Sequence, residues 1–289
     1  MVRHLLTREH LVLGLNALSR AHTSDYFADS HRGAAMIAAY YLCQRQDIEP
    51  GAARIIAEKV EASWSGSPLF APFPEEPSNP ALTGRITQAL AAGTDRLRQA
   101  GHNVIFPALA LKAMAEVPEA VTPLRVAGIC KLVESFTATD EFLDEGDVPI
   151  PGCEDPRALV EFVPGEALRA MERFEGRGQG WTGHLLTHAQ AVMDLHLSGH
   201  PDAVQPARDA LVRYIRRTRM GPGEGDRSIP EHPRSDETPL EERYWQARQG
   251  DDIGLGHCLK YPYAYCSLLD LVCDAGLKSR CENEAYRIL

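Results

Sequence analysis

The chain has 289 residues, of which 44% are hydrophobic, and its formal net charge is −10 at pH 7. This length and composition suit one large globular domain. The negative charge argues against nucleic-acid partners, whose binding grooves need clustered Lys and Arg. No run approaches the roughly 18 apolar residues of a membrane span, and the first residues lack a signal peptide. We therefore expect a cytoplasmic protein without a membrane partner, while a homo-oligomer is left open.

Helical periodicity dominates the first half of the chain. The stretch 65–80 contains five prolines, which cannot all lie inside helices, so a loop is predicted there. Pro107 falls early in one of the expected helices, where a proline is tolerated or causes a kink. The helices expected here span 9–18, 31–44, 50–64, 83–99, 102–116 and 123–136.

The second half begins with an acidic, turn-rich segment, 137–156, and has a Gly/Pro-rich loop at 221–236. Further helices are expected over 164–174, 184–198, 202–218, 240–249 and 257–275. No convincing run of alternating strand residues is present. The pattern predicts an all-α fold, with residues 1–289 forming one domain of about a dozen helices. Helix pairs recurring as pseudo-repeats would surround a buried central site.

The seven cysteines include no C-x-x-C pair, so a zinc ribbon is not expected. An odd number of cysteines, with no secretory signal, favours reduced thiols. Cys266, Cys273 and Cys281 stand seven and eight residues apart, a spacing that predicts one buried face of a helix.

A small residue followed by histidine opens four apolar segments. The four histidines, which stand 71, 82 and 73 residues apart, are His31, His102, His184 and His257. Seven residues later, three of the segments have an alanine, whereas the second has Leu109. A single histidine near a helix start more often caps or packs than binds a ligand. Four in equivalent places predict a joint role, and the usual reason to gather imidazoles is a metal.

His188 is a further candidate because it lies one helical turn after His184 and on the same helix face. Two histidines at this spacing can bind one metal, or one can point inward while the other makes a peripheral hydrogen bond. We favour His184 as the ligand, since only His184 follows the small-residue–histidine pattern. No glutamate follows His184, which excludes the H-E-x-x-H motif of zinc proteases.

Lys260 shares a helix face with His257 and has aromatic neighbours in sequence, including Tyr261 and Tyr263. A lysine in an apolar segment must be paired, neutral or extended toward solvent. Burial would lower its pKa and make the amine available for covalent chemistry. The alternative, a lysine that reaches out of the helix end, has equal weight at this point.

Two acidic groups invite other interpretations. The run from Asp140 to Asp147 superficially fits an Asp-rich magnesium motif, but no second motif follows, and a solvated loop is the better interpretation. Asp251 and Asp252 precede the fourth histidine segment, where a carboxylate could orient a histidine ring. The alternative for this pair is a favourable charge at a helix N-terminus.

The segment His257-Cys-Leu-Lys260-Tyr-Pro-Tyr-Ala resembles the His-x-x-Lys helix of questin oxidase-like proteins. Gly101-His102-Asn-Val-Ile and Ser30-His31-Arg-Gly-Ala are similar to the second and first histidine segments of that family. Gly183-His184 would then correspond to the third histidine segment of that family. The resemblance extends over most of the chain through these short motifs.

This resemblance implies a helical, metal-dependent oxygenase that oxidises or opens quinone rings. The implied metal is iron (Fe2+), with another divalent metal as the alternative, and carboxylated Lys260 would be one of its ligands. The carbamate on Lys260 would derive from CO2. Four imidazoles and one carbamate oxygen would leave one octahedral position open for dioxygen or substrate. Leu109 departs from the pattern, because the family commonly has another histidine there. The four implied histidine ligands are His31, His102, His184 and His257.

We expect an oxygenase that uses dioxygen and a small aromatic or quinone-like natural product, with Lys260 and His188 taking part in catalysis. Aromatic residues near the histidine segments could line its pocket: Tyr40, Tyr41, Phe106, Trp181, Tyr261 and Tyr263. One alternative is a metal-independent lyase, cyclase or hydrolase that uses the histidines for acid–base chemistry. Another is a non-catalytic scaffold whose Gly-His pairs only cap and pack helices.

Overall fold

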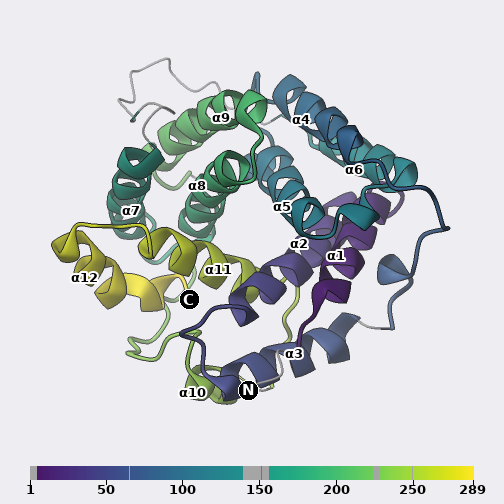
Figure 1. Ribbon diagram of the computed structural model, residues 1–289. Coiled ribbons are helices and arrows are strands. Elements are labelled where there is room, and N and C mark those ends of the chain that lie inside the picture. Colours follow the sequence, from purple (N-terminus) through teal and green to yellow (C-terminus); the bar gives the residue numbers. More distant parts are fainter. Residues whose placement is uncertain (1–4, 65, 139–150, 152–155, 224–227, 249) are drawn as a thin grey trace.

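The computed structural model describes residues 5–64, 66–138, 151, 156–223, 228–248 and 250–289. This part of the chain contains twelve α-helices, five short 3-10 turns and only isolated β-bridges, which confirms the all-α prediction. Four helices contact one another in a closed sequence around the centre (Figure 1). They are α2 (Tyr26–Cys43), α5 (His102–Glu116), α8 (Gly180–Leu197) and α11 (His257–Leu269).

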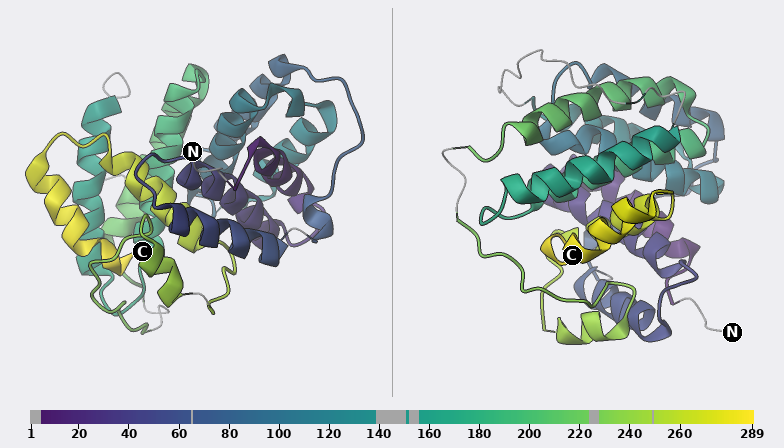
Figure 2. Two further views of the ribbon diagram at one scale, coloured as in Figure 1. Left: turned by 60° about the horizontal axis from the view of Figure 1, so that its bottom comes forward. Right: turned by 90° about the vertical axis from the view of Figure 1, so that its left-hand side faces the viewer.

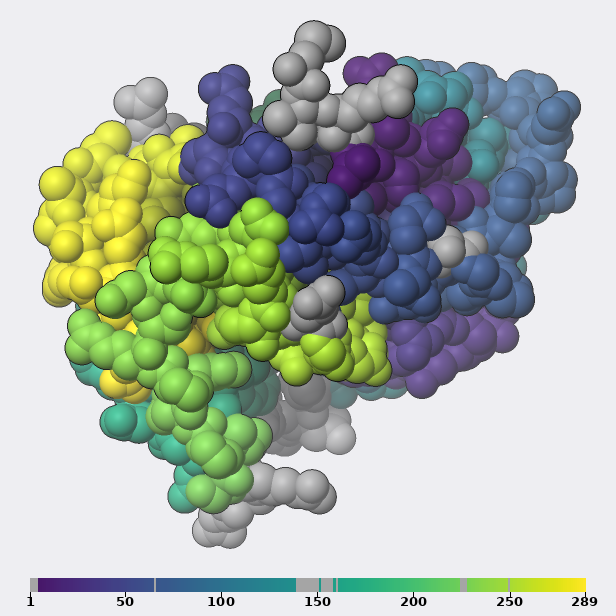
Figure 3. All heavy atoms as spheres, turned by 90° about the horizontal axis from the view of Figure 1, so that it is seen from below, coloured from purple at the N-terminus to yellow at the C-terminus, as the bar shows by residue number. Residues whose placement is uncertain are grey.

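The remaining helices pack outside these four (Figures 1 and 2). Helix α1 covers α2, α7 and α9 cover α8, and α10 lies against α3. Figure 3 shows α3 and the segment around α10 side by side on the lower face. The outer helices are α1 (Arg8–Ala21), α3 (Pro50–Trp64), α4 (Thr83–Ala92), α6 (Pro123–Ser135), α7 (Pro156–Arg173), α9 (Pro201–Arg219), α10 (Glu242–Ala247) and α12 (Ala275–Glu284).

The composition of the helices explains which of them lie inside. Helix α5 is apolar around its whole circumference, and most of its residues are buried, as expected of a helix enclosed by others. Helix α9 instead has an apolar stripe, including Leu211 and Ile215, and an opposite face rich in Arg. It therefore packs on α8 with one side toward solvent. No described helix is both long and apolar enough to cross a membrane.

Several predicted boundaries are wrong for local reasons. Helix α2 begins five residues before His31, because Asp25 caps it by accepting a hydrogen bond from the Ala28 amide. The helix predicted over 83–99 ends at Ala92, before Gly93. The segment 257–275 is not one helix, since α11 ends at Leu269 and Asp274 caps α12.

The predicted cysteine face is also wrong. Cys266 is buried on α11, Cys281 is buried on α12, and Cys273 is exposed between the two helices. The acidic run Asp140–Asp147 lies outside the described residues. The single domain and the paired-helix repeat remain predictions.

The glycines before two of the histidines have a structural role. Gly101 and Gly256 cap α5 and α11 with φ angles of +82° and +69°, a left-handed conformation that glycine adopts without strain. A Cβ on Gly256 would lie 2.2 Å from the Cβ of Ala35 on α2, and one on Gly101 would lie 2.4 Å from Nδ1 of His188. Glycine therefore allows the starts of these helices to approach their neighbours.

Replacing Gly256 by Ala is expected to lower the free energy of unfolding by roughly 2–4 kcal/mol, because left-handed strain adds to overpacking. Urea denaturation would measure the loss. Gly84→Ala is the control, since Gly84 lies in α4 and a Cβ there would meet nothing within 4 Å. Equal stability of the two variants would contradict the close approach of α11 to α2.

Candidate metal centre

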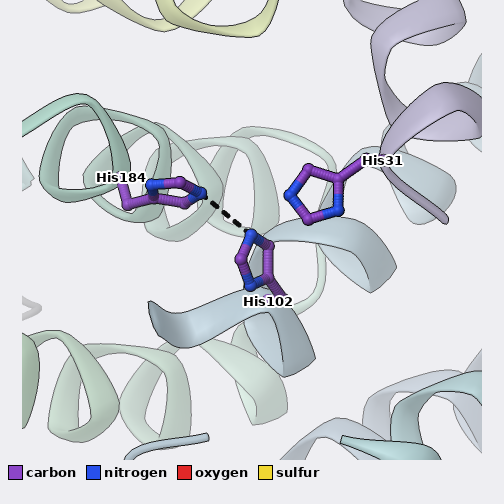
Figure 4. A group of neighbouring side chains, drawn as sticks. All are labelled: His31, His102 and His184. Atoms are coloured by element: carbon purple, nitrogen blue, oxygen red, sulfur yellow. Dashed lines mark hydrogen bonds between the residues drawn. The ribbon is translucent and has the colours of Figure 1, made fainter. Parts of the chain in front are cut away.

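Three of the four predicted histidines converge at the centre of the inner helices. His31 lies on α2, His102 is the first residue of α5, and His184 lies near the start of α8. One ring nitrogen of each lies within 4.8 Å of the others, close enough to bind a single metal ion (Figure 4). His31 and His102 are buried, while His184 keeps partial exposure to solvent.

Backbone carbonyls fix the orientation of all three rings. Nδ1 of His31 lies 2.7 Å from the carbonyl oxygen of Phe27, and Nδ1 of His184 lies 2.7 Å from that of Gly180. Nδ1 of His102 makes the equivalent hydrogen bond to Gln99. A carbonyl can only accept, so Nδ1 carries the proton in each ring and Nε2 keeps a lone pair. Metal-binding histidines are commonly oriented in this way.

The Nε2 atoms are better placed to bind one metal ion than to contact each other directly. Nε2 of His102 and Nε2 of His184 are 2.9 Å apart (Figure 4), so two lone pairs face each other unless a proton or cation lies between them. Two nitrogens bound at about 2.1 Å to one metal, at a right angle, are separated by about 3 Å. Nε2 of His31 is buried and has no hydrogen-bond partner among the described residues.

His257 lies beside this triad. Its ring centroid is 5.1 Å from that of His31 and 5.2 Å from that of His184. Tyr261 stacks on His257, and its hydroxyl lies 3.0 Å from Nδ1 of His184. Nε2 of His257 is buried without a partner among the described residues. The structure thus brings the fourth predicted histidine to the site, although outside the group of three.

Lys260 is buried, with 3% of its surface exposed, so the alternative of a lysine extended toward solvent is wrong. Its Nζ atom has no hydrogen-bond partner in the described part of the chain. Nζ lies 5.4 Å from the ring centroid of Phe106, which also contacts His31 and His102. Burial holds the pKa of Lys260 well below its usual value, which favours the neutral amine.

The same environment keeps the imidazoles neutral. Burial lowers the pKa of His184 to about 4. Burial, with a smaller effect of Lys260, lowers the pKa of His257 to about 2. The pKa values of His31 and His102 are lowered as well, mainly by burial. Neutral imidazole is the form that binds metals.

Acidification is expected to destabilise the metal-free protein. An unfolded histidine takes up a proton near pH 6.5, whereas folded His184 does so only near pH 4. The unfolded state therefore binds more protons between these values, and stability is retained above pH 6.5 and lost as the pH falls toward 4. The slope from His184 is on the order of 1 kcal/mol per pH unit.

Urea denaturation of chelator-treated protein at several pH values would measure this slope. His184→Gln should have a shallower pH dependence than the wild-type chain. Identical slopes would contradict the burial of a neutral imidazole at this position.

His188 is outside the triad. It is fully buried one turn further along α8, against Gly101 and 5.8 Å from the ring of Tyr214. Burial lowers its pKa to about 3, with a smaller opposing effect of the Ala207 backbone. This placement agrees with the sequence-based preference for His184 over His188 as the third histidine of the triad.

Other expected participants lie elsewhere. Asp252 accepts a hydrogen bond from the Gly254 amide, and Nδ1 of each triad histidine contacts a backbone carbonyl. Neither the Asp251 nor the Asp252 carboxylate therefore orients a triad histidine. Trp181 packs on Arg217 and Phe174. Tyr40 donates a hydrogen bond to Glu116. Of the predicted aromatic residues, Phe106 and Tyr261 contact the histidines.

The sequence interpretation missed a second group of polar side chains, the polar cluster of Lys112, Asp194 and Tyr263. Nζ of Lys112 lies 2.7 Å from Oδ1 of Asp194 and 2.6 Å from the Tyr263 hydroxyl, which donates to Oδ2 of Asp194 at 2.7 Å. Lys112 and Asp194 each stand ten residues after a triad histidine on the same helix. That spacing, nearly three helical turns, was the available signal.

No family model, curated protein or solved structure matches the chain. The resemblance to questin oxidase-like proteins therefore stays a prediction from the motifs. The fold and site define an all-α protein with a central histidine triad able to bind a metal ion.

Proposed function

We propose that the chain is a metal-dependent oxygenase that oxidises a small aromatic or quinone-like molecule with dioxygen. The observation that carries the proposal is the convergence of three imidazoles whose Nδ1 atoms are all held by backbone carbonyls. Such orientation leaves Nε2 directed at a shared point, as in metal sites. Iron as Fe2+ is the proposed metal, and another divalent ion is the alternative.

His257 and Lys260 would complete the ligand set. Both lie on α11 at the edge of the triad, and both have a buried nitrogen without a protein hydrogen-bond partner in the described residues. A neutral Lys260 amine can attack CO2, forming an N–C bond while the nitrogen loses a proton. The resulting carbamate would place an anionic oxygen beside the imidazoles. Bound iron would supply the capacity to bind and reduce dioxygen.

The residues around the triad suit an aromatic substrate. Phe106 and Tyr261 pack directly on the histidines and exclude water from the buried side. His184 and His257 retain partial exposure, so a substrate could approach from their side. His188, buried one turn away, would support the packing of Gly101 instead of touching the substrate.

An oxygen-electrode assay tests the proposal. Iron-loaded protein is expected to consume dioxygen in the presence of at least one member of a panel of hydroxylated anthraquinones, and chelator-treated protein is not. Turnover that survives chelation would instead support a metal-independent enzyme that uses the histidines for acid–base chemistry.

A scaffold without activity makes a different prediction. Alanine variants of the triad histidines would then lower the melting temperature independently and additively, because no shared ligand is lost. Strong coupling between His102→Ala and His184→Ala in metal-loaded protein would support the common metal.

A further inference from the structure

The backbone just before α5 has a strained conformation. Gln99 and Ala100 have φ angles of +39° and +58°, and no other described residue except glycine has a positive φ. The Gly101 amide donates to the Arg98 carbonyl at 2.8 Å and closes the turn. Two successive positive φ angles are typical of a type I′ turn, in which Asn and Gly are the preferred residues. The turn is therefore strained, since left-handed backbone is unfavourable for Gln and Ala.

Strained backbone persists only where the surrounding structure holds it, and side-chain hydrogen bonds hold this turn. Arg98 donates from Nε to the carbonyl of Gly93 at 2.8 Å and from Nη1 to that of Phe136 at 3.1 Å. The side-chain amide of Gln99 donates from Nε2 to the hydroxyl of Tyr26 at 2.9 Å. Because Tyr26 is the first residue of α2, the Tyr26–Gln99 contact joins the turn to that helix.

The turn bears on which nitrogen of His102 carries the proton. The Gln99 carbonyl accepts a hydrogen bond from Nδ1 of His102, which leaves a lone pair on Nε2. A competing arrangement is available, because Nε2 of His102 lies 2.9 Å from Nε2 of His184 (Figure 4). If the proton moved to Nε2, His102 could donate it to His184 and would lose the lone pair that a metal needs.

We propose that Gln99 and Tyr26 are positioning residues that keep His102 in the tautomer able to bind a metal. The Tyr26–Gln99 contact holds the strained turn, and the turn directs the Gln99 carbonyl at Nδ1 of His102. The hydrogen-bond partner of a metal-binding histidine fixes its tautomer and ring orientation in this way. Tyr26 stands five residues before His31, so the same contact connects the helices of two triad histidines.

Three variants separate the contact from the strain. Gln99→Gly and Ala100→Gly both relieve left-handed strain, because glycine adopts positive φ freely. Only Gln99→Gly also removes the contact with Tyr26, so Ala100→Gly is its matched control. Tyr26→Phe removes the same contact from the side of α2 and leaves the sequence of the turn unchanged.

Heteronuclear NMR of the imidazole nitrogens in the metal-free chain measures the tautomer of His102. The wild-type chain and Ala100→Gly are expected to have Nδ1–H as the single form. Gln99→Gly and Tyr26→Phe are expected to contain a mixture of both tautomers, an effect that a general loss of stability would not produce. A single Nδ1–H form in either contact variant, or an equal mixture in Ala100→Gly, would overturn the positioning role.

Zinc affinity, measured by competition with a chelator, tests the consequence for metal binding, which rests on the proposed function. Gln99→Gly and Tyr26→Phe are expected to bind Zn2+ about 10-fold more weakly than the wild-type chain, as when a supporting partner of a ligand is lost. Ala100→Gly should bind it as tightly as the wild-type chain. Unchanged affinity in both contact variants would contradict the positioning role. A wild-type chain that binds no Zn2+ would contradict the proposed metal site, and the tautomer of the metal-free chain would still decide the role of the contact.

Discussion

Replacing His184 by alanine is expected to weaken metal binding by about 100-fold or more, because the change removes one imidazole of the triad. Loss of a residue that only supports a ligand already costs about 10–100-fold. Competition titration with a metal chelator, together with elemental analysis of the purified variant, would measure the affinity. Fe2+ and Zn2+ are suitable probes.

The matched control is His188→Ala on the same helix. His188 is fully buried but belongs to no group of potential metal ligands among the described residues. This variant is expected to lose stability and to keep its metal affinity within a few-fold of the wild-type value. Equal loss of metal from both variants, or from neither, would contradict the triad as the binding site.

Lys112→Met should lower the free energy of unfolding by about 3 kcal/mol, at the lower end of the range for a broken buried ion pair. The change leaves the Asp194 carboxylate, whose side chain is 2% exposed, without its cation. The remaining donors, Tyr263 and Gln190, are uncharged. Partial exposure of Lys112 places the effect at the lower end of the range.

Urea denaturation would measure this effect, with the exposed Lys131 as control. Lys131→Met on α6 is expected to change stability by less than about 0.5 kcal/mol. The double variant Lys112→Met/Asp194→Leu should recover part of the loss, because it removes the uncompensated charge. If the double variant is no more stable than Lys112→Met, the ion pair is not the source of the effect.

The helical architecture follows from sequence periodicity, since each helix must bury an apolar face regardless of its neighbours. Helices α3 and α5 have their predicted bounds. The predicted helix boundaries were wrong where a single capping side chain sets the start of a helix, as Asp25 does for α2 and Asp274 does for α12. Such caps are single hydrogen-bonding events that a periodic pattern does not reveal.

The triad was predictable because chemically identical residues recur in similar surroundings. The polar cluster was not recognised because its members differ in type, and Lys112 alone in an apolar helix gives no indication of its partner. Only the packing of α5 against α8 brings Lys112 to Asp194, which is 82 residues away. Asp251 shows the opposite case, since it stands close to His257 in sequence, yet backbone carbonyls hold the rings of the triad in place of its carboxylate.

The starting points of α5 and α11 have an electrostatic consequence. His102 and His257 are the first residues of these helices, so both rings lie at the positive poles of helix dipoles. The unpaired amides of a first helical turn attract negative charge. Any ligand that joined the histidine triad would therefore be favoured as an anion.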